Sequence, residues 1–399
     1  MFVESHPLIA QSQRLAASSS SLGDKIAFLQ RGDSYCPHVS KVTIRETHMS
    51  IVFLAGNRAY KLKKPVHFPY LDFSTLTRRE VACRAELALN RRLARDIYRE
   101  VVPLTYSQDG LAIGGHGTTV DWLVCMKRLD ESQMLDRVIA DRRLHRWQLD
   151  RVAVTLIQFY RRASAVLISP AAYAAGFWRD LSFNRRVLLN PSLGMPPGLV
   201  QSIDATQRRF LRKRREYLAE RVLSRNIVDG HGDLRPEHIW LGDPVRIIDC
   251  LEFNAQLRMV DPLDEIAFLS LECQRLGAAW AGEYLRRRVM HALHDGHLGE
   301  LFLFYRCHRA MLRARLAIAH LLEPDPRTPE KWPALARTYL RLAAADAVRL
   351  EASLRKRRGL QGYRRRQDGG WPWPAAAQPE GCRSLSVRHR GVGTVERSQ

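Results

Sequence analysis

Residues 228–254, VDGHGDLRPEHIWLGDPVRIIDCLEFN, are the most informative stretch of this chain. It places one carboxylate, Asp233, on a loop just after Gly232, and a second carboxylate, Asp249, sixteen positions later. Between them, HIWLG and VRIIDCL are typical of two short strands around a Gly-Asp-Pro turn at 242–244. A β-hairpin of this kind brings the two carboxylates to one rim.

The residue types in this stretch indicate phosphate chemistry. Phosphoryl transfer to a hydroxyl needs a carboxylate close to the nucleophile, oxygen ligands for Mg²⁺, and a cationic group on the nucleotide phosphates. Residues 228–254 supply the first two, because they contain the side chains of Asp233, Asp249, Glu252 and Asn254. The cationic group has to come from another part of the chain.

The same residues resemble a known family. The segment 231–236, HGDLRP, resembles the H-G-D-L-x-P catalytic loop of aminoglycoside and choline kinases, and Ile248-Asp249 is similar to their metal-binding I-D segment. The resemblance implies that Asp233 is the base that accepts or orients the substrate proton and that Asp249 is a Mg²⁺ ligand. It also implies that His231 orders the loop.

A longer part of the sequence resembles one branch of this family. HGDLRPEHI, IIDCLEFN and VDPLDEIAFL together resemble a bacterial branch of uncharacterised aminoglycoside-phosphotransferase-like proteins, some of them fused to a P-loop kinase domain. The motif G-x-x-x-x-G-K-[ST] does not occur in this sequence, so we expect no such second domain.

The family further implies a nucleotide-anchoring lysine on the third strand of a small lobe, paired with a helix glutamate. Lys61, in RAYKLKK, suits that role, and Lys63 stays an alternative because it lies two residues on and shares the strand face. For the glutamate we favour Glu86 over Glu80, because the spacing of Glu86 to the leucines after it matches the family's helix better.

Two other segments are expected to contact the nucleotide by the same resemblance. The loop Thr47-His48-Met49-Ser50, between the first two strands, would lie over the phosphates, with Ser50 as a binding residue. It has no G-x-G-x-x-G, which departs from protein kinases and is tolerated in the aminoglycoside type. The strand that ends in WLVCMKRL would be the hinge, with Met126 near the adenine.

His238 departs from the family, because it occupies the position where the kinase loop carries a second metal-binding asparagine. Mg²⁺ is a hard ion that prefers oxygen ligands, so an imidazole is a poor substitute. Three alternatives follow: a single metal whose shell Glu252 or Asn254 completes, a site that tolerates Mn²⁺, with His238 as a ligand, or the loss of activity.

The strand and helix patterns divide the chain into four parts. Residues 1–39 are expected to form an N-terminal extension. Residues 40–129 combine strands with one helical run and are predicted to be a nucleotide-binding N-lobe. Residues 130–354 are predicted to be a helical C-lobe that contains the catalytic loop, the metal site and the acceptor site. Residues 355–399, rich in Arg, Gly, Pro and Gln, are predicted to be a basic disordered tail. The fold class is α+β: a bilobal protein-kinase-like fold with a small β-rich N-lobe and a large helical C-lobe.

Charge and composition bear on partners and location. The chain has a net charge of +22, and residues 355–399 hold eleven Lys and Arg against three Asp and Glu. The remaining excess is spread over helices, so a solvated basic surface is favoured over nucleic-acid binding. No stretch of about 18 apolar residues and no export signal is present, and the seven cysteines are scattered without a C-x-x-C pair. These features predict a cytoplasmic protein with reduced thiols and no membrane span.

Some polar residues of the C-lobe have simpler interpretations. Asp261 and Asp264 precede an apolar helical run and are predicted to cap it. Tyr305, Arg309 and Arg313 recur every four residues, which fits either an acceptor pocket for an anionic substrate or a solvated helix face.

Taken together, the sequence predicts an ATP-dependent phosphotransferase that moves the γ-phosphate to a hydroxyl of a small molecule, with ATP and Mg²⁺, or Mn²⁺, as cofactors. The acceptor is not identified by the sequence. The alternative is a catalytically inactive nucleotide-binding pseudokinase or scaffold, associated with nucleic acid, which the basic surface and His238 support.

Overall fold

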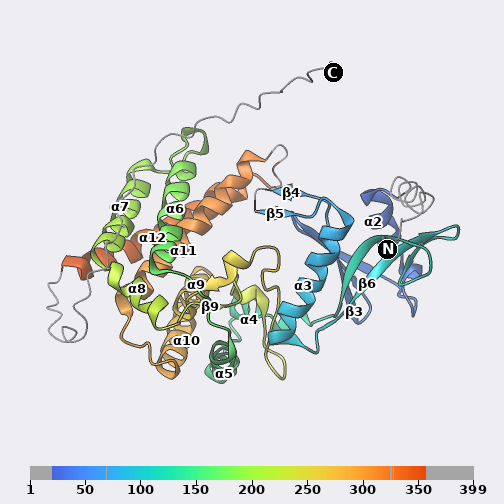
Figure 1. The fold of residues 1–399 in the computed structure, drawn as a ribbon, viewed down its shortest axis with the longest axis horizontal. Coiled ribbons are helices and arrows are strands. Elements are labelled where there is room, and N and C mark those ends of the chain that lie inside the picture. Colours follow the sequence, from blue (N-terminus) through green and yellow to red (C-terminus); the bar gives the residue numbers. More distant parts are fainter. Residues whose placement is uncertain (1–19, 69, 324–325, 327, 356–399) are drawn as a thin grey trace, which may run out of the picture. The chain divides into compact units, whose positions relative to one another are not determined.

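A six-stranded antiparallel sheet forms the N-lobe of the computed structural model, which describes residues 20–68, 70–323, 326 and 328–355 (Figure 1). Its strand order is β1-β2-β3-β8-β6-β7. The strands span Val42–Glu46 (β1), Ser50–Ala55 (β2), Arg58–Lys63 (β3), Tyr98–Ser107 (β6), Gly110–Ile113 (β7) and Thr118–Lys127 (β8). The two-residue turn between β2 and β3 contains Gly56 at a φ of 57°, a conformation that glycine adopts without steric cost.

Helix α3, Leu76–Ala94, packs against this sheet and begins where Thr75 accepts a hydrogen bond from the backbone N–H of Arg78. Its buried face includes Cys83, Glu86 and Leu93. The short strands β4 (His67–Phe68) and β5 (Leu71–Asp72) form a hairpin between β3 and α3.

Part of the expected N-terminal extension is folded. Helix α2, Leu22–Gln30, starts with a capping box between Ser21 and Asp24 and is followed by the 3₁₀ turn η1, Gly32–Ser34. Leu29 of α2 is fully buried in the same apolar cluster as Phe53 and Leu62 of the sheet. Residues 1–19, and the predicted tail from residue 356 onward, lie outside the described residues.

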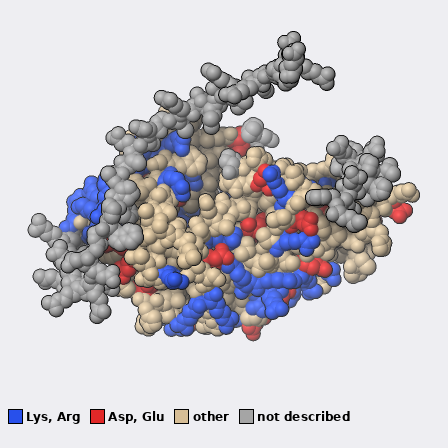
Figure 2. All heavy atoms as spheres, viewed as in Figure 1, with Lys and Arg blue, Asp and Glu red and all other residues tan. Residues whose placement is uncertain are grey.

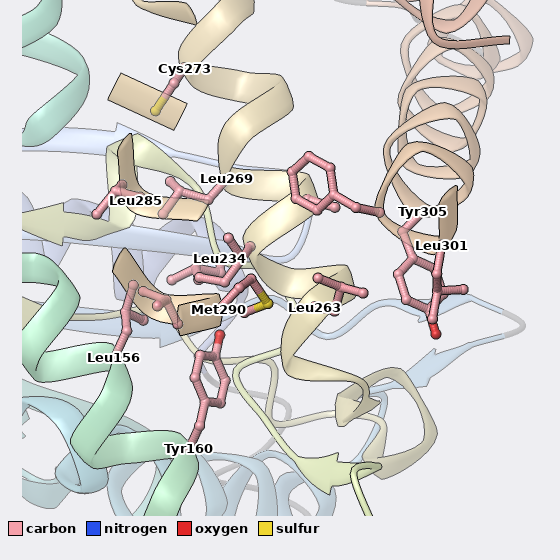
Figure 3. Close-up of a cluster of buried hydrophobic side chains, with 14 of the residues drawn as sticks. Leu156, Tyr160, Leu234, Leu263, Leu269, Cys273, Leu285, Met290, Leu301 and Tyr305 are labelled. Atoms are coloured by element: carbon pink, nitrogen blue, oxygen red, sulfur yellow. The ribbon is translucent and has the colours of Figure 1, made fainter. Parts of the chain in front are cut away.

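The C-lobe is built from helices around α9, Pro262–Arg275, in which every residue from Pro262 to Cys273 is buried. The other helices are α4 (Leu135–Ala140), α5 (Arg146–Arg162), α6 (Pro170–Leu188), α7 (Pro197–Lys213), α8 (Arg215–Leu223), α10 (Ala279–Ala292), α11 (Gly299–Ala319) and α12 (Lys331–Arg355), with the 3₁₀ turns η2 (Glu131–Gln133), η3 (Pro191–Leu193) and η6 (His320–Leu322). Figure 3 shows apolar side chains of this core, among them Leu156, Leu263, Leu269 and Leu285. Leu234, from the H-G-D-L loop, belongs to the same cluster, so the core anchors that loop.

Short strands fix the position of residues 228–254. Val228–Asp229 (β9) pairs with Met259–Val260 (β12), and Ile239–Trp240 (β10) pairs with Arg246–Ile247 (β11) as the predicted hairpin. The 3₁₀ turns Pro236–His238 (η4) and Ala255–Arg258 (η5) complete the segment. Asp249, at the end of the hairpin, contacts Lys61 of the N-lobe, and His238 lies between Asp249 and the loop of Asp233.

The surface, the cysteines and the helices add three observations. Figure 2 shows Lys and Arg spread over one face, densest along its lower edge, with Asp and Glu among them. Six cysteines lie within the described residues, all as free thiols, and each except Cys36 is buried. Within the part of the chain that the structure describes, no helix combines the length and the apolar character that crossing a lipid bilayer requires.

Candidate active site

Two lysines of β3 reach one glutamate of α3. The Nζ atom of Lys61 lies 2.8 Å from Oε1 of Glu86, and the Nζ atom of Lys63 lies 2.7 Å from its Oε2. The two lysines are two residues apart on the strand, so they project from the same face. Glu80 instead forms an ion pair with Arg84, which is largely exposed. The structure thus brings Glu86, and not Glu80, to both candidate lysines.

The second partners of the two lysines differ. The Nζ atom of Lys61 is also 2.8 Å from Oδ1 of Asp249, whereas Lys63 forms its second ion pair with Glu252. The side chain of Lys61 is 13% exposed and that of Lys63 is 0% exposed. Lys61 therefore connects the N-lobe to the predicted metal ligand and is partly exposed to solvent, whereas Lys63 is fully buried.

The two residues considered as additional metal ligands have other partners. Glu252 pairs with Lys63, and Asn254 accepts a hydrogen bond from the backbone N–H of Gln256 at 2.9 Å, which caps η5. Neither contact is with Asp249. The carboxylate of Asp249 instead lies between Lys61 and His238, whose Nε2 is 3.5 Å from Oδ2 of Asp249.

Opposite charges set the protonation states of this cluster. Enclosure by the protein raises the pKa of the Asp249 carboxyl, but the charge of Lys61 outweighs that effect and lowers the pKa well below its usual value. Burial lowers the pKa of Lys61, yet Asp249 and Glu86 raise it well above the usual value overall. Lys61 and Asp249 are therefore both charged at neutral pH.

His231 connects the loop of Asp233 to the hairpin. Its Nε2 donates to the carbonyl oxygen of Ile248 at 2.9 Å, and its Nδ1 accepts the backbone N–H of Asp233 at 3.3 Å. Burial lowers the pKa of His231 to about 4, so the ring is neutral at pH 7 and has one donor and one acceptor for these two bonds. This geometry suits a residue that orders the loop.

Glu265, at the start of α9, holds the backbone of the same loop. Its Oε1 accepts the N–H groups of His231, at 3.0 Å, and of Gly232, and its Oε2 accepts the hydroxyl of Tyr160 at 2.9 Å. Gly232 has a φ of 87°, the left-handed region that favours glycine. Glu265 was not singled out from the sequence. The signal that could have found it is a carboxylate at the start of an apolar helical run, which the structure shows to be buried on all sides.

We expect Glu265→Ala to destabilise the protein by at least about 2 kcal/mol, since each buried donor left without a partner costs about 1–3 kcal/mol. Urea unfolding measures this change. Glu80→Ala, which removes a surface glutamate paired with Arg84, is the matched control and should change the free energy of unfolding by less than about 0.5 kcal/mol. Equal stabilities of Glu265→Ala and wild type would contradict this role.

Asp233, the predicted base, is paired with a neighbouring cation. The guanidinium of Arg235 contacts Oδ2 of Asp233 through Nε at 3.0 Å and through a terminal nitrogen at 2.7 Å. Burial raises the pKa of Asp233, but the charges of Arg235 and His238 outweigh burial and lower it overall. The carboxylate is ionised at neutral pH and can accept a proton. Arg235 was not singled out from the sequence, although it stands only two residues after the predicted base.

His238 lies between the predicted base, Asp233, and the predicted metal ligand, Asp249. Its Nδ1 lies 2.9 Å from the carbonyl oxygen of Asp233, so Nδ1 carries a proton and donates it to that oxygen. Its Nε2 faces Oδ2 of Asp249 at 3.5 Å and a guanidinium nitrogen of Arg235 at 3.2 Å. The imidazole therefore fixes the loop of Asp233 and places its second nitrogen beside Asp249.

The donor set at Asp249 fits a divalent cation bound together with nucleotide phosphates. Mg²⁺ is commonly held by one or two carboxylates, with phosphate and water oxygens in the other positions. The Asp249 side chain is 46% exposed, which leaves its oxygens accessible. Its φ of 61° lies in the left-handed region, a conformation that aspartate tolerates better than most residues and that often marks functional sites.

Ser50 and Met126 lie on the lysine-bearing face of the sheet. Ser50 pairs directly with Lys63 across β2 and β3, and Met126 pairs with Ala59 across β8 and β3, two residues from Lys61. Directly paired residues of antiparallel strands point to the same face. Ser50 is buried, and its backbone N–H donates to the Oγ1 of Thr47 at 3.0 Å.

The C-lobe polar residues form buried ion pairs. Asp261 accepts the N–H of Leu263 at 2.9 Å, as predicted for a cap, and also pairs with Arg221 at 2.7 Å. The expected solvated helix face is wrong for Tyr305, which is fully buried and donates to Asp261, and for Arg309, which pairs with Asp264 at 2.7 Å. The reason is that carboxylates at the start of α9 are buried in the core, where they form ion pairs and hydrogen bonds with side chains of α8 and α11.

Arg313, the third member of that helical series, is closer to the surface. Its Nε lies 3.3 Å from the Tyr339 hydroxyl and 3.3 Å from Oε1 of Glu272, and its side chain is 22% exposed. Its charge also contributes to lowering the pKa of Asp233. Arg313 is therefore the member of the series that remains a candidate for the acceptor site.

The sequence has uncharacterised relatives among known proteins. No protein-family model matches the sequence. Uncharacterised proteins of Mycobacterium tuberculosis and Mycobacterium bovis are 32% identical over 312 residues, which cover 77% of this chain. The chain spans 58% of the length of these relatives.

Among solved structures, the GDP complex of a mutant aminoglycoside 2'-phosphotransferase-IIIa superimposes with a TM-score of 0.50 over 79% of this chain and 94% of that chain, at 15% identity. The chain has the protein-kinase-like fold of the aminoglycoside phosphotransferases. The predicted fold class, with a β-rich N-lobe and a helical C-lobe, is confirmed. A choline kinase from Cryptosporidium parvum aligns with a TM-score of 0.49 and 10% identity over 78% of this chain and 90% of its own.

Proposed function

We propose that this protein is an ATP-dependent phosphotransferase that moves the γ-phosphate of ATP to a hydroxyl of a small-molecule acceptor. The observation that carries the proposal is the position of Lys61, which lies between Glu86 and Asp249 at 2.8 Å from each. A phosphate-binding cation and a metal-binding carboxylate are thereby adjacent, and His238 links them to the loop of Asp233.

In this proposal the N-lobe, residues 40–129, binds the nucleotide. Lys61 would contact the phosphates, Ser50 and the loop before it would cover them, and Met126 would lie near the adenine. Asp249, with His238 beside it, would hold Mg²⁺ or Mn²⁺, which would neutralise charge on the phosphates. A cytoplasmic location suits ATP as the donor and the free thiols of the chain.

The C-lobe, residues 130–354, would supply the base and bind the acceptor. Asp233 would accept or orient the proton of the attacking hydroxyl, and it suits this role because Arg235 keeps it ionised. Both contacts of Arg235 fall on Oδ2, so we expect Oδ1 to face the acceptor. His231 would keep the loop in register by its bonds to Ile248 and to the backbone of Asp233.

Calorimetric titration with ATP tests the nucleotide and metal assignments. We expect wild type to bind ATP with Mg²⁺ and Asp249→Ala to bind it at least about tenfold more weakly, because the variant loses a metal ligand. Asp141→Ala, which removes a half-exposed aspartate that pairs with Arg143, is the control and should bind as wild type does. Unchanged binding by Asp249→Ala would contradict the site.

Two observations support the second candidate, a pseudokinase that binds nucleotide without transferring phosphate. His238 replaces the expected asparagine, and Arg235 occupies one oxygen of the base. Metal-dependent ATP binding, together with neither hydrolysis nor transfer across a panel of hydroxylated metabolites, would favour this candidate. ADP release that requires both the metal and an added acceptor would exclude it.

A further inference from the structure

Three side chains with metal-binding atoms meet outside the charged cluster of Lys61, Asp233 and Asp249. His48 lies in the loop between β1 and β2, His320 begins η6 at the end of α11, and Glu323 follows η6. Figure 1 shows the end of α11, in orange, near β4 and β5 of the N-lobe. The cluster thus joins the loop at 47–49 to the end of a C-lobe helix.

The geometry of the cluster brings the three ligand groups together. Nδ1 of His320 is 2.7 Å from Oε1 of Glu323, and Nδ1 of His48 is 3.6 Å from Oε2 of the same carboxylate. The two imidazole rings stack with centroids 4.7 Å apart, and the ring of His320 also packs on Trp332 at 4.1 Å. Each of the two histidines therefore faces a different oxygen of one glutamate.

The chemistry of the three groups points to one class of ion. One ligand atom from each residue lies within 4.8 Å of the other two, and no other group of at least three His, Cys, Asp or Glu meets this condition in residues 20–68, 70–323, 326 and 328–355. Imidazole nitrogens suit Zn²⁺ and related divalent transition metals, whereas Mg²⁺ prefers oxygen. Two histidines and one glutamate form a known zinc ligand set, with water in the fourth position.

The surroundings permit the small movement that coordination needs. Zinc sits about 2.0–2.2 Å from nitrogen and oxygen ligands, so the three ligand atoms would have to draw closer together. The side chains of His48, His320 and Glu323 are 44%, 25% and 34% exposed, so His48 and Glu323 have room to rotate and water can complete the shell. Packing on Trp332 limits the freedom of His320 and reduces the entropy that binding would cost.

We propose that His48, His320 and Glu323 bind a divalent transition-metal ion of the Zn²⁺ type, which fastens the loop at 47–49 to the C-terminal end of α11. This site is separate from the cation site at Asp249 in both position and ligand chemistry. Its existence does not depend on phosphotransfer, so binding can be tested without nucleotide or acceptor.

Calorimetric titration of the full chain with Zn²⁺, after chelator treatment and in excess Mg²⁺, tests the site. We expect wild type to bind one equivalent of Zn²⁺. His48→Ala and His320→Ala should not bind it, and Glu323→Gln should bind it at least about tenfold more weakly. His38→Ala is the matched control, because His38 is an exposed histidine paired with a single carboxylate, Asp33, at 2.9 Å. Zn²⁺ binding that is equal in wild type and in all three cluster variants would overturn the proposal.

Hydrogen exchange provides a second measurement, because nonspecific binding of Zn²⁺ at other surface residues would not slow exchange in this loop. Zn²⁺ should slow amide exchange at residues 47–49 in wild type and in His38→Ala, and should leave it unchanged in His320→Ala, although that substitution lies 272 positions along the chain from His48. Thermal unfolding without Zn²⁺ verifies that each variant is folded. Bound Zn²⁺ with no slowing at 47–49 would overturn the proposed link between loop and helix.

Discussion

Asp233→Asn is expected to lower kcat for phosphoryl transfer about 10²–10⁴-fold, the usual contribution of a general base. The amide is nearly the same size as the carboxylate but cannot accept the proton of the hydroxyl. ATP binding should change little, because Lys61 and Asp249, the residues proposed to contact the phosphates and the metal, contact each other and not Asp233. The measurement is ADP release in a coupled assay, with an acceptor found by screening hydroxylated metabolites and with calorimetry on the same preparation.

A second partner of Arg235 and a matched control make this result interpretable. Arg235 loses its ion pair with Asp233 in the variant but keeps Glu237 as a partner, so the guanidinium is not left unpaired. Asp141→Asn, at a half-exposed aspartate, is the matched control and should leave kcat unchanged. If Asp233→Asn transferred phosphate as fast as wild type while binding ATP equally well, Asp233 would not be the base.

The fold was predictable because its strongest signals are local. The hairpin at 239–247 follows from two apolar runs around a Gly-Asp-Pro turn, and the sheet strands β2 and β3 follow from the turn that begins at Gly56. Pairing within one hairpin depends on residues close in sequence, which periodicity and turn residues describe well. The placement of α2 on the sheet depends on Leu29 meeting Phe53 and Leu62, and no local pattern contains that contact.

The candidate site was predictable in part. The motif resemblance led to Asp233, Asp249 and His231. In the structure His231 accepts the backbone N–H of Asp233, and Asp249 lies beside His238. The alternative between Lys61 and Lys63 remained open because a period of two places both on one strand face. Only tertiary structure separates them, through their burial and through the second ion-pair partner of each lysine.

Residues that act on the site from distant elements could not be predicted from local sequence. Glu265 binds the loop from 34 and 33 positions further along the chain, at His231 and Gly232. The cluster of His48, His320 and Glu323 joins two lobes. A single histidine or glutamate has no periodicity of its own, so only tertiary structure shows which of the chain's 14 histidines meet a carboxylate and another histidine.

The two lysines of β3 are expected to have separate roles, which methionine substitutions can distinguish. Lys63→Met should destabilise the protein by about 3–5 kcal/mol, because it leaves the Glu252 carboxylate buried without its cation. Lys61→Met should leave the fold largely intact, since Lys63 still neutralises Glu86, but should lower kcat/KM about 10²–10³-fold through the loss of a preorganised cation at the phosphates. Urea unfolding and the coupled assay, run on both variants, measure the two effects.

Lys64→Met is the matched control, because Lys64 is the next residue of the chain and pairs with Glu46 near the surface. It should alter neither stability nor kcat/KM by a comparable amount. The distinction between Lys61 and Lys63 rests on burial and on the second partner of each lysine, since both are equally close to Glu86. A folded Lys63→Met variant that lost activity, beside an active Lys61→Met variant, would therefore reverse the assignment and make Lys63 the nucleotide anchor. Loss of stability in both variants to the same extent would mean that the four charged residues around Glu86 act as one structural network, with no lysine reserved for the nucleotide.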